Sequence, residues 1–409
     1  MTDSLKDKEI TELADKILSR YKLCDHCLGR VFAKIEHDKT NRERGEGVRK
    51  TLKHLSKTEV DKCWLCSGLM NEIPHFADLI SDSLKGYDFQ TFLVGSKIDE
   101  DILGREQELF GFAGCLYSEP IKMEVNREIG KILEDRLCKT VDFKKPTIMA
   151  VVDTAFDVVN LQISSLYVYG RYKKYRRDMP QTRWFCRVCK GKGCRKCNYT
   201  GKMYEKSVEE AIAKSFLTAT GATGESFHGS GREDIDARML GNGRPFVLEI
   251  INPVTRNISL SSIESEINTS NKDEVEVSGL RFSDSDEVVR IKGAEFKKVY
   301  RVVLNGEQSL NTEKLKKAVR SLQGATIRQF TPLRVAHRRA NTIREKYVYS
   351  CKLESVDDTI ATLTVEAESG TYIKELISGD DGRTKPSISE IIGVPCKVLE
   401  LDVIEIKGE

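Results

Sequence analysis

Apolar residues recur along this chain with a helical period at the start and with mixed periods farther on. Over residues 1–74, five of them form one amphipathic stripe: Leu5, Ile10, Leu13, Ile17 and Leu18. This spacing predicts a helical element. From residue 75 to 183 the pattern becomes mixed, with a helix expected over 126–137 and β-rich runs over 147–152 and 158–168.

A further domain is expected over residues 205–409. Its first helix has a start signal, the capping box of Ser207 and Glu210, and a stop signal at Gly221. One more helix and five strands are expected, at 311–322 and at 244–251, 295–304, 347–353, 359–366 and 397–406. The acidic, serine-rich stretch 263–287 is expected to be an exposed excursion. Because helices are few and irregularly spaced, the pattern predicts an α+β domain with a mostly antiparallel mixed sheet flanked by helices.

Composition narrows the class of protein. The chain has 409 residues, which predicts two or three domains. It has no apolar run long enough for a membrane span and no leader-like start, so we expect a cytoplasmic protein without a membrane partner.

The net charge of +3 hides two strongly basic stretches. Residues 171–202 hold twelve Lys or Arg against one acid, Asp178, and residues 328–346 hold six against Glu345. Such clusters in a nearly neutral chain are typical of a phosphate-binding surface, although a solvated basic face has the same composition. Within them we single out Lys173, Lys174, Arg338 and Arg339 as candidate substrate-binding residues.

Eight of the twelve cysteines form C-x-x-C pairs that group in fours. The first group is Cys24, Cys27, Cys63 and Cys66, and the second is Cys186, Cys189, Cys194 and Cys197. In a cytosolic chain such groups predict tetrahedral zinc sites, and four thiolates leave no open position for catalysis, so the zinc is expected to be structural. The second group defines a compact knuckle over 184–204, in which glycines permit the tight turns. A redox role is the alternative, but no thioredoxin-like context surrounds the pairs.

Three segments of the last domain suggest one site. A glycine-flanked loop, GRED, ends in Asp234 just before a strongly apolar strand; KKVYRVVL places Tyr300 on a strand; GTYIKEL places Lys374 at a helix start. A short carboxylate on such a loop suits covalent or proton-transfer chemistry, although a plain turn explains it equally well.

These segments resemble the shared motifs of pseudouridine synthases. Together with the cysteine groups, the strand order before GRYKKYRR, which resembles a THUMP domain, and TPLRVAHRRA, the whole chain resembles the archaeal-type tRNA pseudouridine 54/55 synthases, the Pus-ten family. The resemblance implies a catalytic Asp234, a base-stacking Tyr300 and a Lys374 that pairs with Asp234, with Arg232 holding phosphate or the flipped strand. It also implies tRNA as partner, no catalytic cofactor and an isomerase acting on uridine 54, uridine 55 or both.

Rivals remain for each role. Asp236 is the alternative carboxylate, Tyr372 the alternative stacking residue, and Glu233 a competitor for the lysine. No protein partner is implied. The alternative functions are a non-catalytic, zinc-stabilised tRNA-binding protein or another THUMP-type modifying enzyme, although the chain has neither a Walker A motif nor G-x-G-x-x-G. The expected domains are 1–74, 75–183, 184–204 and 205–409.

Overall fold

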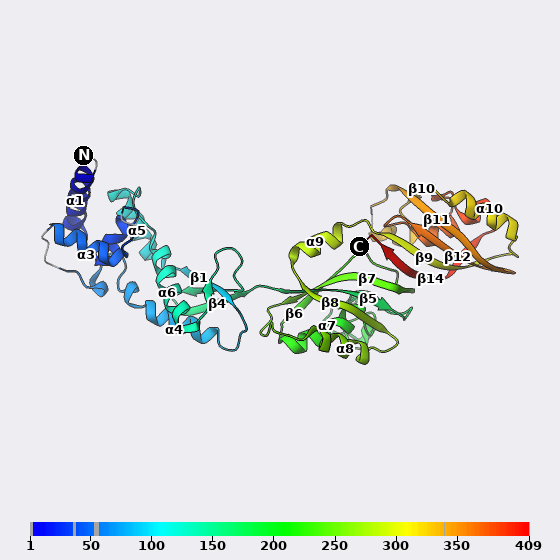
Figure 1. Ribbon diagram of the computed structural model, residues 1–409, viewed down its shortest axis with the longest axis horizontal. Helices are drawn as coiled ribbons and strands as arrows, with labels where there is room; N and C mark the ends of the chain where they lie inside the picture. Colours follow the sequence, from blue (N-terminus) through cyan, green and yellow to red (C-terminus); the bar gives the residue numbers. More distant parts are fainter. Residues whose placement is uncertain (1–2, 36–37, 53–56, 339, 409) are drawn as a thin grey trace. The chain divides into compact units, whose positions relative to one another are not determined.

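A computed structural model describes residues 3–35, 38–52, 57–338 and 340–408. It divides into two compact units, 1–164 and 165–409, each with its own apolar core (Figure 1). Among the described residues, no helix is both long and apolar enough to cross a bilayer.

The first unit joins a helical, cysteine-containing part to a small sheet. Its elements are α1 (Asp3–Arg20), α2 (Asp25–Val31), α3 (Asn41–Leu52), η1 (Val60–Lys62), η2 (Leu69–Asn71), α4 (Ile73–Ser83), β1 (Thr91–Lys97), α5 (Glu100–Ala113), α6 (Ile121–Leu137), β2 (Thr140–Val141), β3 (Ile148–Asp153) and β4 (Val158–Ile163). The sheet order is β2-β1-β3-β4, with only the β3–β4 pair antiparallel.

The helical start of the chain is confirmed. In α1, Ile17 is fully buried, while Ile10, Leu13 and Leu18 pack against the same core; the side chain of Leu5 lies outside the described residues. The helix expected over 126–137 is α6, which begins earlier, after Pro120.

The second unit is built on one large sheet. Its elements are β5 (Leu166–Lys174), η3 (Arg195–Cys197), α7 (Val208–Thr220), β6 (Gly224–Gly229), β7 (Ala237–Ile251), α8 (Leu260–Ser270), β8 (Val275–Ser283), α9 (Ser285–Gly293), β9 (Lys297–Gly306), α10 (Thr312–Leu322), β10 (Ala325–Phe330), η4 (Leu333–Arg338), β11 (Ile343–Asp357), β12 (Ile360–Ala367), α11 (Ile373–Ser378), β13 (Thr384–Lys385), α12 (Ile388–Ile392) and β14 (Cys396–Lys407).

The order of this sheet is β13-β10-β11-β12-β9-β14-β7-β5-β8, with β6 also on β7. Its pairs are antiparallel except β14 with β7, as the sequence predicts. Helix α7 begins at Ser207, whose side chain accepts a hydrogen bond from the Glu210 N–H, and it ends at Gly221 with φ +61°. The sheet places the central strands β9, β14 and β7 side by side, which brings distant segments of the sequence to one site.

One sequence prediction about the end of the first unit is wrong. The apolar run 158–168 is not one strand: β4 ends at Ile163, and β5 starts a different sheet by pairing with β7 and β8. The second unit therefore begins before residue 183, and GRYKKYRR belongs to it. Alternation alone does not show that a chain changes sheets between two serines.

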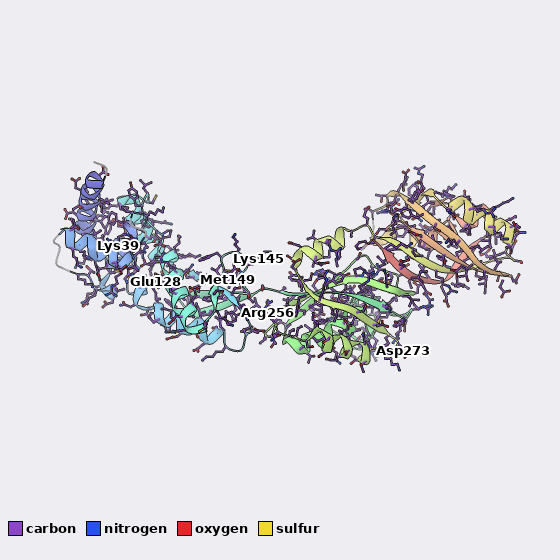
Figure 2. The ribbon with its side chains drawn as sticks, viewed as in Figure 1. Lys39, Glu128, Lys145, Met149, Arg256 and Asp273 are labelled. Atoms are coloured by element: carbon purple, nitrogen blue, oxygen red, sulfur yellow. The ribbon has the colours of Figure 1, made fainter. Side chains whose placement is uncertain are left out.

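The stretch 263–287 is not an exposed excursion. It contains most of α8, all of β8 and the start of α9, and Figure 2 labels Asp273 in the turn between α8 and β8. Ile263 and Ile267 lie one helical turn apart on the buried face of α8, and Val275 and Val277 alternate on β8. The serines and acids cover the outer faces, so the overall polarity of the stretch conceals its buried stripe.

Candidate active site

A pocket of about 840 Å³ opens in the second unit, within the size range of ligand sites. Its lining includes the loop before β7, strand β9, the η4 segment and the start of α11, together with Trp184 and residues of β7, β11 and β14. The predicted Asp234, Tyr300, Lys374, Arg232 and Tyr372 all lie on its wall. The structure therefore brings together five candidates that lie between residues 232 and 374 of the sequence.

Asp234 lies on a tight turn, in which the Ala237 N–H donates to the Asp234 carbonyl at 3.0 Å. The turn follows Gly231, which has φ +77°. A Cβ on Gly231 would lie 3.0 Å from Nζ of Lys298 and 3.3 Å from Nη1 of Arg244. Glycine is required there by both its backbone conformation and the close approach of these two cations.

Two cations hold the Asp234 carboxylate. Arg334 Nη1 donates to Oδ1 at 3.0 Å, and Lys374 Nζ lies 3.5 Å from Oδ2. Arg334 also binds the buried Glu375 through Nε at 2.7 Å, which fixes its guanidinium. The Asp234 side chain keeps 30% of its surface exposed and so remains accessible from the pocket.

Lys374 makes its shorter contacts with Asp236, at 2.8 and 2.7 Å to the two carboxylate oxygens. Burial opposes ionisation of Asp236, but the hydrogen bond and charge of Lys374 outweigh it and lower the pKa of this carboxyl group. Asp236 is 65% exposed, against 30% for Asp234. The lysine thus bridges both carboxylates, with Asp234 deeper in the wall.

Glu233 does not compete for Lys374. It is buried in an ion pair with Arg244, at 2.9 Å from Nε, and accepts hydrogen bonds from the Tyr172 hydroxyl at 2.9 and 3.0 Å. Arg244 also donates to the Ser230 carbonyl at 2.8 Å. This buried pair anchors the loop one residue before Asp234, so Glu233 positions the carboxylate that follows it.

Tyr300 is buried in the pocket wall on β9, between β12 and β14. Burial raises the pKa of Tyr300 to about 12, with Arg244 opposing and Asp234 reinforcing the shift. The ring is therefore a neutral phenol near pH 7. Tyr372 is the N-cap residue of α11, and its backbone N–H and carbonyl both bind the Gln329 side chain at 2.9 Å.

The basic candidates have different positions. Arg232 lies with its guanidinium 4.8 Å from the ring centre of Trp184 at the pocket wall. Lys173 pairs with Glu276 at 2.9 Å. Lys174 is fully buried and donates to the carbonyls of Met179 and Ile235, so the structure contradicts its prediction as a surface phosphate ligand.

The basic stretch 328–346 comprises the end of β10, the short η4 turn and the start of β11. Arg338 ends η4, but its side chain and the whole of Arg339 lie outside the described residues. Sequence reasoning chose these two arginines and missed Arg334 four residues earlier. In the sequence, only the high density of Lys and Arg in this stretch pointed to Arg334.

Both cysteine groups fit a metal ion. In each, the four Sγ atoms lie within 4.8 Å of one another, as tetrahedral thiolate ligation requires. In the knuckle, N–H groups of Gly193, Cys194 and Gly201 donate to Sγ atoms at 3.2–3.3 Å, and positive φ angles at Gly191, Gly193 and Gly201 allow its turns. The first group is buried and accepts a hydrogen bond from Arg30 to Cys27 Sγ at 3.4 Å.

Comparison with known proteins decides the family. The family described as "Pus10, C-terminal" matches residues 167–407, and "Pus10 THUMP domain, archaeal" matches 76–153. This chain belongs to the Pus10 family. A Pus10 tRNA pseudouridine synthase from Methanothrix thermoacetophila is 39% identical over 100% of this chain and 96% of its own. One from Methanothermobacter marburgensis is 42% identical over 97% of this chain and 99% of its own. The Pus10 family enzymes are isomerases.

The Pus10 match also agrees with the unit boundary. The C-terminal family begins at residue 167, in β5, where the second unit begins, and the THUMP match ends at the last residue of β3. Among solved structures, a Cbf5-Nop10-Gar1 complex overlaps 49% of this chain and 45% of its own, with 17% identity and a TM-score of 0.31.

Lys298 was missed by sequence reasoning, although its spacing from Tyr300 places both on one face of β9. It lines the pocket, is buried, and donates weakly to the Ser369 hydroxyl at 3.5 Å. The pKa of Lys298 is lowered to about 7, chiefly by burial; the charges of Arg244 and Lys346 act in the same direction and that of Glu233 opposes them.

Replacing Lys298 by methionine is expected to stabilise the fold in a pH-dependent way. The folded pKa lies below that of an unfolded lysine, so the wild type gains stability as pH rises from about 7 toward about 10.5. The advantage of Lys298→Met should therefore be largest below pH 7 and shrink above it. Urea unfolding at pH 6, 7.5 and 9 measures this. The exposed neighbour Lys297→Met is the control, and an equal pH dependence in both variants would contradict the assignment.

Proposed function

We propose that this chain converts uridine to pseudouridine at position 54, position 55 or both in the TΨC loop of tRNA, in the cytoplasm and without a catalytic cofactor. In this reaction the C1′–N1 bond breaks, the uracil turns, and C1′ bonds to C5. The C5 proton is lost and N1 gains one, so the nucleotide keeps its composition. No oxidant, reductant or group donor is needed.

The observation that carries the proposal is the accessible Asp234 carboxylate, held by Arg334 and Lys374 over the face of the pocket that contains Tyr300. The two cations orient the Asp234 carboxylate, and a carboxylate is the form of this side chain that acts as nucleophile or base. The carboxylate either bonds to the substrate or removes a ribose proton. The Tyr300 ring supplies a flat wall for the uracil, and stacking of this kind contributes about 1–3 kcal/mol per base.

Nothing in this site requires a metal, and the two cysteine groups have structural roles in the proposal. Zinc there would hold its four thiolates in a closed tetrahedron and stabilise the surrounding turns. Trp184, the first residue of the knuckle, lines the pocket, and the guanidinium of the loop residue Arg232 lies over its ring.

The test uses the full chain and an unmodified tRNA transcript, with no added cofactor. Pseudouridine is mapped at nucleotide resolution after incubation, and product at 54 or 55 is expected. Transcripts with cytidine at 54, at 55 or at both are the controls. Tight binding without any pseudouridine would instead favour a non-catalytic tRNA-binding protein, and product only elsewhere in the tRNA would refute the positional assignment.

A further inference from the structure

The basic stretch 171–202 separates into two functional parts in the structure. Seven of its twelve cations bind carboxylates or backbone carbonyls of the second unit: Arg171, Lys173, Lys174, Arg176, Arg177, Arg183 and Lys202. These cations stabilise the fold. Five of them are paired with carboxylates, and Arg171 and Lys174 donate to carbonyls, so these side chains are already engaged within the fold and contribute little to an RNA surface.

The remaining five cations all belong to the cysteine knuckle: Arg187, Lys190, Lys192, Arg195 and Lys196. All five are exposed, and among the described residues no carboxylate oxygen lies within 4.0 Å of them. The knuckle sequence from Trp184 to Tyr204 contains no Asp or Glu. Even after the thiolates take up a metal ion, the module keeps an uncompensated positive surface.

The same module exposes apolar side chains that a small folded knuckle normally covers. Phe185 is 55% exposed, Val188 61% and Tyr199 75%. The Phe185 ring lies against Gly191, where a Cβ would come within 2.9 Å of it, so one edge of the ring is held. Tyr199 projects from a left-handed backbone position with φ +62°. Aromatic rings among cations are typical of surfaces that stack unpaired bases and neutralise their phosphates.

The knuckle is joined to the catalytic pocket. Trp184 lines the pocket immediately before Phe185, and Tyr204, at the other end of the module, packs edge-on against Trp184 at 5.6 Å. Arg232, two residues before Asp234, lies over the same indole ring. A bridge between Phe185 and Lys202 closes the base of the module. RNA bound in the pocket therefore has this module as its neighbour.

We propose that the second cysteine module is an RNA-binding surface for unpaired nucleotides that flank the target uridine. Tyr199 and Phe185 stack on bases, and the five knuckle cations bind the adjoining phosphates. A paired RNA does not bind this surface in the same way, because its bases are already stacked on one another and cannot stack on the two rings. The proposal rests on the proposed function for its substrate, an unpaired loop of tRNA.

The test measures binding separately from turnover. The variants are Tyr199→Ala, the conservative Tyr199→Phe, and the double variant Arg195→Gln with Lys196→Gln. A matched control, Lys314→Gln with Lys317→Gln, removes the same charge from exposed positions on α10. Metal content and thermal unfolding are measured first, so that only variants with an intact knuckle are compared. The probes are unmodified tRNA, an isolated TΨC stem-loop and a fully paired RNA duplex.

We expect Tyr199→Ala to weaken binding of tRNA and of the stem-loop about tenfold and Tyr199→Phe to restore it. The arginine-lysine double variant should reduce the salt dependence of stem-loop binding by about 1.4 in the logarithmic slope, the value for two phosphates on a single strand. The control double variant should keep the wild-type slope. Binding of the duplex should not depend on Tyr199.

Wild-type affinity and salt dependence in Tyr199→Ala and in the knuckle double variant, with the metal retained, would overturn the proposal. That result would also be obtained if the surface bound a protein instead of RNA. The outcome is independent of the proposed function. A chain that forms pseudouridine while these variants bind normally refutes only the RNA surface, whereas Tyr199-dependent binding without any pseudouridine refutes only the catalytic assignment.

Discussion

Replacing Asp234 by asparagine is expected to lower pseudouridine formation about a thousandfold or more while tRNA affinity stays within a few-fold. The amide keeps the shape of the side chain but is neither a nucleophile nor a base at neutral pH. Arg334 and Lys374 would lose their shared anion, and Lys374 would keep Asp236. Single-turnover assays with saturating enzyme, together with a binding isotherm for the same transcript, separate the two effects. Asp234→Ala should behave in the same way.

The matched control is Asp236→Asn, two residues away. Lys374 contacts both carboxylates and both line the pocket, but the Asp236 side chain is 65% exposed, against 30% for Asp234. Turnover in Asp236→Asn is expected to fall about tenfold or less, because the lysine can then move closer to Asp234. If Asp236→Asn were inactive and Asp234→Asn active, the catalytic role would belong to Asp236. Loss of tRNA binding together with activity in Asp234→Asn would favour a binding function for the site.

The sequence predicted those parts of the fold that have a local signal. The capping box at Ser207, the amphipathic α10 and the long alternating strands needed no tertiary information. The change of sheet after Ile163 has no such signal, because both β4 and β5 are β-rich and the break between them is two ordinary serines. In α8 the buried isoleucines are surrounded in the sequence by serines and acidic residues. The average polarity of the stretch therefore suggested an exposed segment, although the spacing of the isoleucines is helical.

The residues of the candidate site also fall into two groups, those that the sequence identified and those that only the folded structure reveals. Asp234, Tyr300 and Lys374 stand in short motifs, so a family resemblance was enough to select them, and the pocket brings them together. Arg334 and Lys298 depend on which side chains face the pocket, and only the packed sheet determines that. The pairing of Glu233 with Arg244 joins a loop to a strand position that sequence spacing does not relate. The sequence therefore identified Glu233 as a rival for Lys374, while packing makes it a support for Asp234.

The second large effect is expected from the first cysteine group. Replacing the fully buried Cys27 by serine removes one of four closely spaced thiolates, and with it the Sγ atom that accepts one of the hydrogen bonds of Arg30. Arg30 is buried and is bound by Glu124 at 2.8 Å, so the change also disturbs the junction of α2 with α6. Metal binding by such groups supplies about 10–16 kcal/mol in small zinc domains. We therefore expect loss of one zinc ion and local unfolding of the segment from α1 to η2.

Zinc analysis of the purified chain is expected to give two ions per wild-type molecule and one per Cys27→Ser molecule. Limited proteolysis should then cleave the variant within residues 1–72, while Cys115→Ser, an exposed cysteine outside both groups, should match the wild type. Every residue lining the proposed active-site pocket lies between 184 and 403, in the second unit. Isomerisation of an isolated TΨC stem-loop should consequently persist in Cys27→Ser. A wild-type chain with fewer than two zinc ions would remove the metal from the first group, and intact protease resistance in the variant would show that the core there is stable without it.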